Sequence, residues 1–404
     1  MRVVSVVALS VLGMALSSGM VLAQDNPPTA ASGPAPVLLQ AQRDISPSDP
    51  GKAAYDAGNY AEALRIWTPL AEAGNSTAQY NLGLLYDTGH GTPQDYALAA
   101  AWYAKAADQG DPNAQFAMGI YCEQGRGVPQ DYAAAADWYR KAAAQGLPEA
   151  QLNLGVLFSH GRGVVQDFAA AARMFQKAAD QGVAVAQFNL GLAYYDGNGV
   201  AKDYALAASW FRKAADQGYA DAQYNLGVQY MDGEGVPQDY AAAAEWYRKA
   251  ADQGIANAQF NLGVLYYNGH GVARDYGQAL AWYSKAADQG NIDAMYNLGV
   301  MYAHGQGVPE NHAIAVSWYR KAADRGEPDA QFNLGVDYAT GSGVAKDFVQ
   351  AYKWFALAAV QATTAEERTS AAQDRDLASS FLTSAQLAQA RKLVKAWAPI
   401  SGAP

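Results

Sequence analysis

Side chains that catalyse reactions or bind metal ions are scarce in this sequence of 404 residues, which contains five histidines and a single cysteine, Cys122. Zinc sites take His and Cys ligands at short spacings, and many serine hydrolases carry a Gly-x-Ser-x-Gly turn. None of these patterns occurs, and the Gly-x-Gly steps of the chain follow no predicted strand, as a nucleotide-binding loop requires. The sequence therefore predicts no enzyme, no cofactor and no metal site.

Two of the histidines, His90 and His270, stand in the middle of a Gly-x-Gly step that recurs along the chain. The same middle position holds arginine, asparagine, glutamate, glutamine and serine in the other copies. Because the position accepts such different side chains, we expect it to be exposed and unconstrained. His312 instead replaces an aromatic residue at the start of a predicted helix, so we expect it to pack. Cys122 replaces a Tyr or Phe of the other copies, so we expect a buried, unreactive thiol.

A recurring aspartate is the most numerous candidate for acid–base chemistry. It stands before a predicted helix in seven copies, with Asn311 as a variant in an eighth: Asp95, Asp131, Asp167, Asp203, Asp239, Asp275 and Asp347. An aspartate in this place accepts hydrogen bonds from the free N–H groups of the first helical turn, which stabilises the helix by about 1 kcal/mol. We therefore interpret the series as helix caps and not as catalytic carboxylates.

A second recurring polar residue is an asparagine, found at Asn81, Asn153, Asn189, Asn225, Asn261, Asn297 and Asn333, with Ala117 as the exception. Each side-chain amide offers a donor and an acceptor, so the row is able to hold an extended peptide backbone. Alternatively, each asparagine bonds to the neighbouring repeat and fixes the angle between repeats. The sequence leaves both interpretations open.

Close to the asparagines lies a position whose residue type varies from copy to copy, which we call the variable row: Asp87, Glu123, Ser159, Tyr195, Met231, Tyr267, Ala303 and Ala339. Its members are acidic towards the N-terminus and apolar or aromatic around the middle. A site for one particular partner needs such variation, because identical positions cannot select a ligand. The candidate partner-binding residues are therefore Asn153, Asn189, Asn225, Asn261, Asn297, Tyr195, Met231 and Tyr267.

These residues are placed by a strict repeat. A Leu-Gly or Met-Gly step recurs every 36 residues, with its glycine at Gly83, Gly119, Gly155, Gly191, Gly227, Gly263, Gly299 and Gly335. A fixed period of this length indicates a solenoid of stacked helical hairpins. In one unit we predict a helix A over 256–267 and a helix B over 276–288, capped by Asp275.

The glycine of helix A lies in the middle of the helix, where it costs about 1 kcal/mol relative to alanine. We expect this cost to be tolerated because the missing Cβ lets helix B pack closely against helix A. Gln259 lies on the buried side of the same helix, and six other copies keep glutamine there. We expect its aliphatic stem to be packed and its amide to bond to the backbone.

The pattern Ala-x-x-x-Leu-Gly-x-x-Tyr, Gly-x-Gly-Val, Asp and Trp-Tyr-x-Lys-Ala-Ala-x-x-Gly resembles the Sel1-like repeat, a relative of the tetratricopeptide repeat. The resemblance implies an all-α, right-handed superhelix with a concave inner surface that serves as a scaffold or adaptor for protein partners. Some exported bacterial members contact host proteins, cell-envelope assemblies or peptidoglycan-related ligands. The cysteine-rich branch of the family has a disulfide in each repeat, so functions of that branch do not carry over.

The chain divides into six predicted regions. They are a signal peptide (1–23, cleaved after Ala23, with an uncleaved anchor as the alternative), a flexible linker (24–47), a tetratricopeptide-like hairpin (48–74), eight repeats (75–362), capping helices (363–397) and a disordered tail (398–404). In the caps we expect six apolar residues to cover the last repeat: Leu377, Phe381, Leu387, Leu393, Val394 and Trp397. The leader predicts a periplasmic or secreted protein.

The net charge of −10 and the lack of a basic stripe argue against nucleic acid as a partner. We also expect no direct membrane insertion after signal cleavage. Three functions stay open: an exported scaffold that binds a protein or peptide on its concave face, a protein that binds or hydrolyses a cell-envelope glycan or peptidoglycan fragment, and a part that only stiffens a larger complex.

Overall fold

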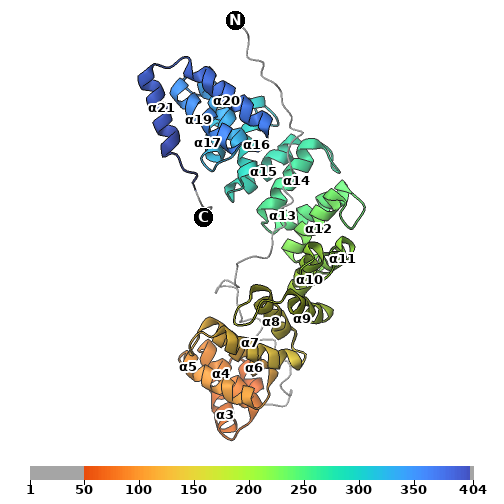
Figure 1. Cartoon of the computed structure of the whole chain (residues 1–404). Coiled ribbons are helices and arrows are strands. Elements are labelled where there is room, and N and C mark those ends of the chain that lie inside the picture. The colour runs from red at the N-terminus through yellow and green to blue at the C-terminus, as the bar shows by residue number, and fades with distance from the viewer. Residues whose placement is uncertain (1–49, 401–404) are drawn as a thin grey trace. The chain divides into compact units, whose positions relative to one another are not determined.

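Helices account for all the regular structure of residues 50–400, the range that the computed structural model describes (Figure 1). The predicted signal peptide, the linker and residues 401–404 of the tail lie outside this range. The helices are α2 (Pro50–Asp56), α3 (Tyr60–Glu72), α4 (Ser76–Thr88), α5 (Tyr96–Asp108), α6 (Pro112–Gln124), α7 (Tyr132–Ala144), α8 (Pro148–His160), α9 (Phe168–Asp180), α10 (Ala184–Asp196), α11 (Tyr204–Asp216), α12 (Ala220–Asp232), α13 (Tyr240–Asp252), α14 (Ala256–Asn268), α15 (Tyr276–Asp288), α16 (Ile292–His304), α17 (His312–Ala323), α18 (Pro328–Thr340), α19 (Phe348–Gln361), α20 (Ala365–Ser379) and α21 (Ser384–Ala396). The prediction of an all-α solenoid of helix pairs is confirmed.

The ends of these helices follow from local chemistry. The Asp275 carboxylate accepts a hydrogen bond from the backbone N–H of Gln278 at 2.9 Å and so caps α15. The other aspartates of the series, and Asn311, cap their helices in the same way. At the other end, α14 stops at Gly269, whose positive φ of 75° turns the chain out of the helix. The interpretation of the aspartates as helix caps is confirmed.

Within each repeat, the glycine of helix A makes room for an aromatic ring of helix B. A Cβ built on Gly263 would lie 2.7 Å from the ring of Tyr283, closer than any real contact allows. The same holds at the seven other copies, where the ring belongs to Tyr103, Tyr139, Phe175, Phe211, Tyr247, Tyr319 or Phe355. The close packing predicted from the glycine is confirmed, and the group that needs the space is a ring. In the N-terminal hairpin, Gly51 makes the same room for Trp67.

Neighbouring repeats are joined by buried glutamines. The side-chain amide of Gln259 donates to the Ala251 carbonyl of the preceding repeat at 3.0 Å, as predicted, and it is only 5% exposed. Its Oε1 also accepts a hydrogen bond from Nε2 of Gln289, at the end of the same repeat, at 2.8 Å. The same arrangement recurs as Gln79–Gln109, Gln115–Gln145, Gln151–Gln181 and Gln187–Gln217. We call these the glutamine pairs.

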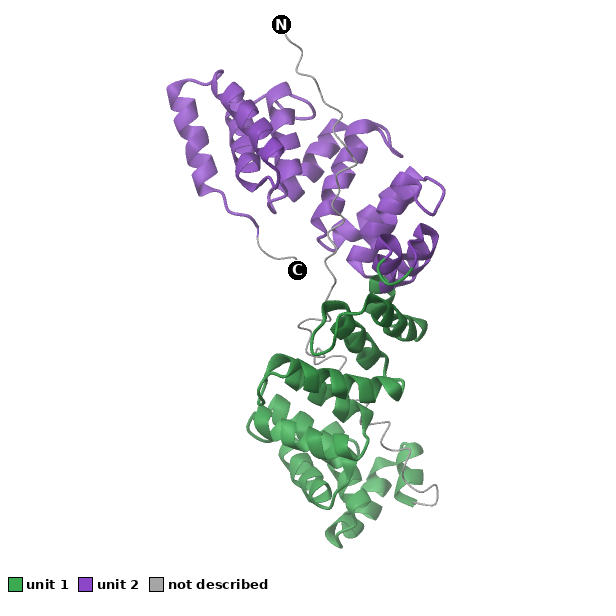
Figure 2. Ribbon diagram, turned by 45° about the vertical axis from the view of Figure 1, so that its right-hand side comes forward, with its two compact units in different colours: residues 1–225, 234–236 green, residues 226–233, 237–404 purple. Residues whose placement is uncertain are grey.

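The chain forms two compact units (Figure 2). Unit 1 comprises residues 1–225 and 234–236, and its described part holds the hairpins from α2–α3 to α10–α11. Unit 2 comprises residues 226–233 and 237–404 and holds α13, the hairpins α14–α15, α16–α17 and α18–α19, and the helices α20 and α21. In both units the core consists of alanines, leucines and aromatic rings contributed by both helices of each hairpin.

Helices α20 and α21 both pack on α19 and close unit 2. Val394 and Trp397 pack on the core as predicted. The prediction was wrong for Leu377, which is 50% exposed, and is confirmed only in part for Phe381, which is 58% exposed. Helix α20 instead approaches α19 through two alanines, Ala371 and Ala378, because small residues allow closer packing. The Phe381 ring stacks on Phe348 at a centroid distance of 4.5 Å, so it covers the last repeat only at its edge.

Candidate interaction surface

The asparagine row lies on helix A of successive repeats, and its members differ in burial. Asn225 is fully buried, whereas Asn261 and Asn297 retain less than a tenth of their surface. Asn153 and Asn189 are half-buried and remain accessible to a partner. The candidate site residues of this row therefore divide into an accessible pair and a buried set.

Several asparagines are hydrogen-bonded to a tyrosine of the preceding repeat. Asn153 bonds the hydroxyl of Tyr139, and Asn297 bonds that of Tyr283; burial raises the pKa of both phenols. Asn225 instead donates from Nδ2 to the Asp221 carbonyl at 2.9 Å. Contacts between repeats thus engage part of the row, as expected if these residues fix the angle between repeats.

The acidic members of the variable row are also bonded within unit 1. The Tyr121 hydroxyl donates to Asp87 at 2.6 Å, and the Tyr139 hydroxyl donates to Glu123 at 2.6 Å. Burial raises the pKa of Asp87, and the hydrogen bond from Tyr121 and the charge of Arg126 partly oppose the rise. Asp87 is therefore part of the junction between two repeats, whereas Glu123 joins the two helices of its own repeat.

The two tyrosines of the variable row make matching contacts, one in each unit. The Tyr195 hydroxyl donates to Glu234 at 2.5 Å, and the Tyr267 hydroxyl donates to Gln306 at 2.8 Å. Both acceptors are the middle residue of the next Gly-x-Gly loop. Each ring also packs on the first residue of its own helix B, which is Tyr204 or Tyr276. Glu234 and Gln306 were not among the predicted site residues, although their constant offset of 39 residues from the tyrosines is a signal in the sequence.

The tyrosines keep part of their surface, whereas Met231 does not. Tyr195 and Tyr267 are half-buried, so part of each side chain remains accessible to a ligand. Met231 is 4% exposed and belongs to the core of unit 2. The accessible candidates of both rows are therefore Asn153, Asn189, Tyr195 and Tyr267.

The middle position of the Gly-x-Gly loop is more constrained than predicted. The His90 ring stacks on Tyr60 at a centroid distance of 4.3 Å, and its Nδ1 is buried. The reason is that the second glycine of each loop lies against the start of helix B of the preceding repeat: a Cβ on Gly271 would meet the Tyr240 carbonyl carbon at 2.2 Å. The residue before that glycine is therefore brought onto the same aromatic side chain. His270 lies 5.2 Å from the Tyr240 ring but is exposed.

The remaining candidate places for a small ligand offer little chemistry. Cys122 is a buried free cysteine, as predicted, and burial raises the pKa of its thiol. Within residues 50–400, no group of three or more His, Cys, Asp or Glu side chains is placed to hold a metal ion. No helix of that range is long and apolar enough to cross a membrane.

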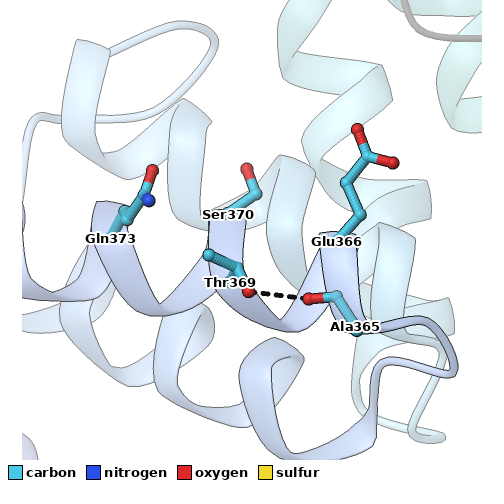
Figure 3. Close-up of a pocket in the computed structure, with 5 residues that line it drawn as sticks. All are labelled: Ala365, Glu366, Thr369, Ser370 and Gln373. Carbon is cyan, nitrogen blue, oxygen red and sulfur yellow. Dashed lines mark hydrogen bonds between the residues drawn. The ribbon is translucent and has the colours of Figure 1, made fainter.

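A depression on α20 is lined by five residues of that helix: Ala365, Glu366, Thr369, Ser370 and Gln373 (Figure 3). The Thr369 hydroxyl donates to the Ala365 carbonyl at 2.7 Å, one turn earlier in the same helix. Because all its lining residues come from one helix, no polar groups converge on a bound molecule there. We assign it no function.

The repeats match a known family. The Sel1 repeat model matches residues 76–111, 112–147, 148–183, 184–219, 220–255, 256–291, 292–327 and 328–361. No curated protein matches the chain. One similar solved structure is that of c5321, a protective antigen of uropathogenic Escherichia coli with an SLR fold. Its sequence is 34% identical, the match covers 83% of this chain and 79% of the c5321 chain, and the TM-score is 0.59. A Sel1 repeat protein from Oxalobacter formigenes is 37% identical over 73% of this chain and 90% of its own, with a TM-score of 0.56.

The family model spans an uninterrupted array of tandem copies, and their boundaries coincide with the hairpins that the structure contains. Similar solved structures have the same repeat. This chain belongs to the Sel1 repeat family.

Proposed function

We propose that this protein is an exported scaffold that binds a protein or peptide partner on the helix A side of its repeats. Repeats of this family generally mediate protein–protein interactions. The observation that carries the proposal is the variable row, where Tyr195 and Tyr267 present partly accessible aromatic side chains in an otherwise regular framework. Tyrosine is enriched at binding surfaces because its rigid ring supplies a large contact area together with a hydroxyl.

Export is proposed from the apolar leader of the sequence, which ends in small residues before Ala23. The similar structure of c5321 is that of a protective antigen, and this supports a location outside the cytoplasm. Cell fractionation of the full chain and of a form lacking residues 2–23 tests this part. Recovery of both forms in the cytoplasm contradicts export.

Site-specific photocrosslinking tests the binding surface. A photoreactive phenylalanine analogue replaces Tyr195 in unit 1 or Tyr267 in unit 2, and each is matched by an exposed position on helix B of the same repeat, Ser209 or Ala281. We expect both tyrosine positions to crosslink to the same protein and both control positions to give no product. Equal crosslinking at all four positions, or none at the tyrosines, contradicts the proposal.

The second candidate function, binding or hydrolysis of a cell-envelope glycan, is favoured by the same accessible aromatic side chains, because sugar rings stack on tyrosine. Sedimentation with purified cell wall separates the two functions. A scaffold for proteins stays in the supernatant, whereas a glycan-binding protein sediments and is released when Tyr195 and Tyr267 are both replaced by alanine.

A further inference from the structure

The junction between the last two repeats of unit 2 concentrates carboxylates. Asp293 lies in the first turn of α16, Glu327 caps α18, and Asp329 lies in the first turn of α18. Asp337 lies two turns further along α18. We call these four residues the acidic junction. Asp329 and Asp337 share one side of α18 with Asn333, since residues four apart are neighbours on a helix.

Asp337 is the unusual member of this group. The same repeat position is occupied elsewhere by Leu85, Tyr121, Leu157, Ala193, Gln229, Leu265 and Met301, so no other repeat has a charge there. The side chain is 9% exposed, and its Oδ2 is buried without a hydrogen-bond partner in the described structure. A buried carboxylate without a partner is costly, and its effect on stability is unfavourable unless a cation or a proton compensates it.

The junction itself supplies little positive charge. Burial raises the pKa of Asp337 to about 7, and the charge that opposes this rise is that of His312 on α17. His312 is itself 3.0 Å from Glu310 and so is shared with a second carboxylate. Tyr319, also on α17, is the other titratable neighbour, and Asp337 contributes to raising the pKa of its hydroxyl.

The other three carboxylates act on one another. Burial, together with the charges of Asp329 and Asp293, raises the pKa of Glu327 to about 8. Burial also raises the pKa of Asp293 and Asp329, although both residues keep exposed surface that a ligand can reach.

Two tyrosines connect the carboxylates to Asp337. Asn333 is hydrogen-bonded to Tyr296 and to Tyr319, and the rings of these tyrosines lie 6.0 Å apart. Tyr296 is influenced by Asp329 and Glu327, and Tyr319 by Asp337. The exposed carboxylates and Asp337 therefore act on two neighbouring tyrosines, one on α16 and one on α17.

We propose that the acidic junction binds a basic segment of the partner polypeptide, with an arginine or lysine side chain paired to Asp337. This inference rests on the proposed scaffold function and adds the chemistry of the partner. An incoming guanidinium supplies the hydrogen-bond donors that Asp337 lacks, and charge-assisted bonds of this kind are stronger than neutral ones. The exposed carboxylates then attract the neighbouring cationic residues of the segment.

A consequence of this pairing is coupled proton release. Without a ligand, Asp337 holds a proton up to about neutral pH. Pairing with a cation requires the ionised form, so affinity should increase as the pH rises through 7 and become constant above it.

Fluorescence anisotropy on the full chain tests the proposal, with a labelled Arg-Gly-Arg-Gly-Arg peptide as the probe and its glutamine counterpart as the peptide control. Asp337→Asn and Asp329→Asn are compared with Asp288→Asn, which removes an exposed charge from the end of α15. We expect the Asp337→Asn affinity to fall at least tenfold and its pH dependence between 6 and 8 to vanish, with Asp288→Asn close to the wild type.

Equal affinity in Asp337→Asn and wild type, or an equal loss in Asp288→Asn, overturns the proposal. So does displacement of the peptide by micromolar Ca²⁺, which would make the junction a metal site. Asp337→Leu, which copies the residue at Leu265, serves as a second variant if the asparagine variant fails to fold. The crosslinks at Tyr195 and Tyr267 are independent: their loss contradicts the scaffold function, whereas unchanged peptide binding in the Asp337 variants contradicts this inference alone.

Discussion

Gln289 donates a hydrogen bond from its side-chain nitrogen to the side-chain oxygen of Gln259 at 2.8 Å, while Gln259 itself donates to the Ala251 carbonyl of the preceding repeat. One amide thus connects the end of its own repeat with the end of the repeat before it. In the seventh repeat both positions change together, to Met295 and Arg325. The two residues therefore act as one structural element, which is kept or replaced as a pair.

Replacing Gln259 by methionine, as in the seventh repeat, should lower the free energy of unfolding by about 1–3 kcal/mol, because the Ala251 carbonyl and the Gln289 amide both lose a partner. Urea unfolding followed by circular dichroism measures the change. Gln278→Met on the exposed side of α15 is the control and should have little effect. An equal effect of the two substitutions contradicts the role of the glutamine pairs.

Gly263→Ala should also destabilise the protein, although alanine is the better helix former. The new methyl group would lie 2.7 Å from the Tyr283 ring, and overpacking of this kind costs about 1–3 kcal/mol, against a gain of about 1 kcal/mol in helix propensity. The control is Gly277→Ala, near the start of α15, where the other copies have Ala97, Ala133, Ala169, Ala205, Ala241 and Ala313. This control should leave stability unchanged or raise it; a stabilised Gly263→Ala contradicts the packing argument.

The regular part of the fold could be predicted because it depends on local rules repeated at a fixed spacing. Asp275 and Gly269 define the ends of their helices by capping alone, and Gly263 marks the packing face. The contacts between repeats were harder to predict. The sequence shows that Gln259 and Gln289 recur, but only the folded hairpin brings their amides together, and only its packing on the preceding repeat brings the Gln259 amide to the Ala251 carbonyl.

The candidate site was predicted less well for the same reason. The variable row identified Tyr195 and Tyr267 as unusual. Their hydroxyl groups, however, bond to residues of the next repeat, and the residue pattern within a single repeat does not predict that contact. Leu377 was expected to be covered because it is apolar, but the alanines of α20 allow the closer approach and leave it at the edge. Asp337 is a charged residue at a position that is mostly apolar in the other repeats, and the sequence already contains this signal.

A missing hydrogen bond in unit 1 gives a third prediction. The Tyr103 hydroxyl is buried without a partner, whereas Tyr139 and Tyr283 bond to an asparagine 14 residues later. The corresponding residue for Tyr103 is Ala117. Ala117→Asn should therefore raise the free energy of unfolding by about 1 kcal/mol through the new hydrogen bond.

A double-mutant cycle with Tyr103→Phe checks that this gain comes from the hydroxyl. Tyr103→Phe alone should be neutral or stabilising, because it removes an unpaired buried polar group. In the Tyr103→Phe background, Ala117→Asn should lose its benefit and leave the amide unsatisfied. A gain of equal size in both backgrounds contradicts the pairing.

The buried carboxylate of Asp337 predicts how stability depends on pH. Burial raises its pKa to about 7 in the folded protein, whereas an aspartate in the unfolded chain has a pKa of about 3.9. Between these values the folded state binds a proton that the unfolded state has released, so the free energy of unfolding decreases as the pH rises from about 4 to about 7. Glu327, whose pKa burial raises to about 8, acts in the same direction over a similar range.

Asp337→Leu removes that carboxylate and puts an apolar side chain in its place. Leu157 and Leu265 show that leucine fits this position in other repeats. Relative to the wild type, the variant should be stabilised more at pH 8 than at pH 5, since the cost of the ionised carboxylate applies only at the higher pH. Urea unfolding at the two pH values measures the difference, and Asp288→Asn serves as a control with an exposed carboxylate. A stability difference between Asp337→Leu and the wild type that is the same at both pH values contradicts the prediction, because a change in packing alone does not depend on pH.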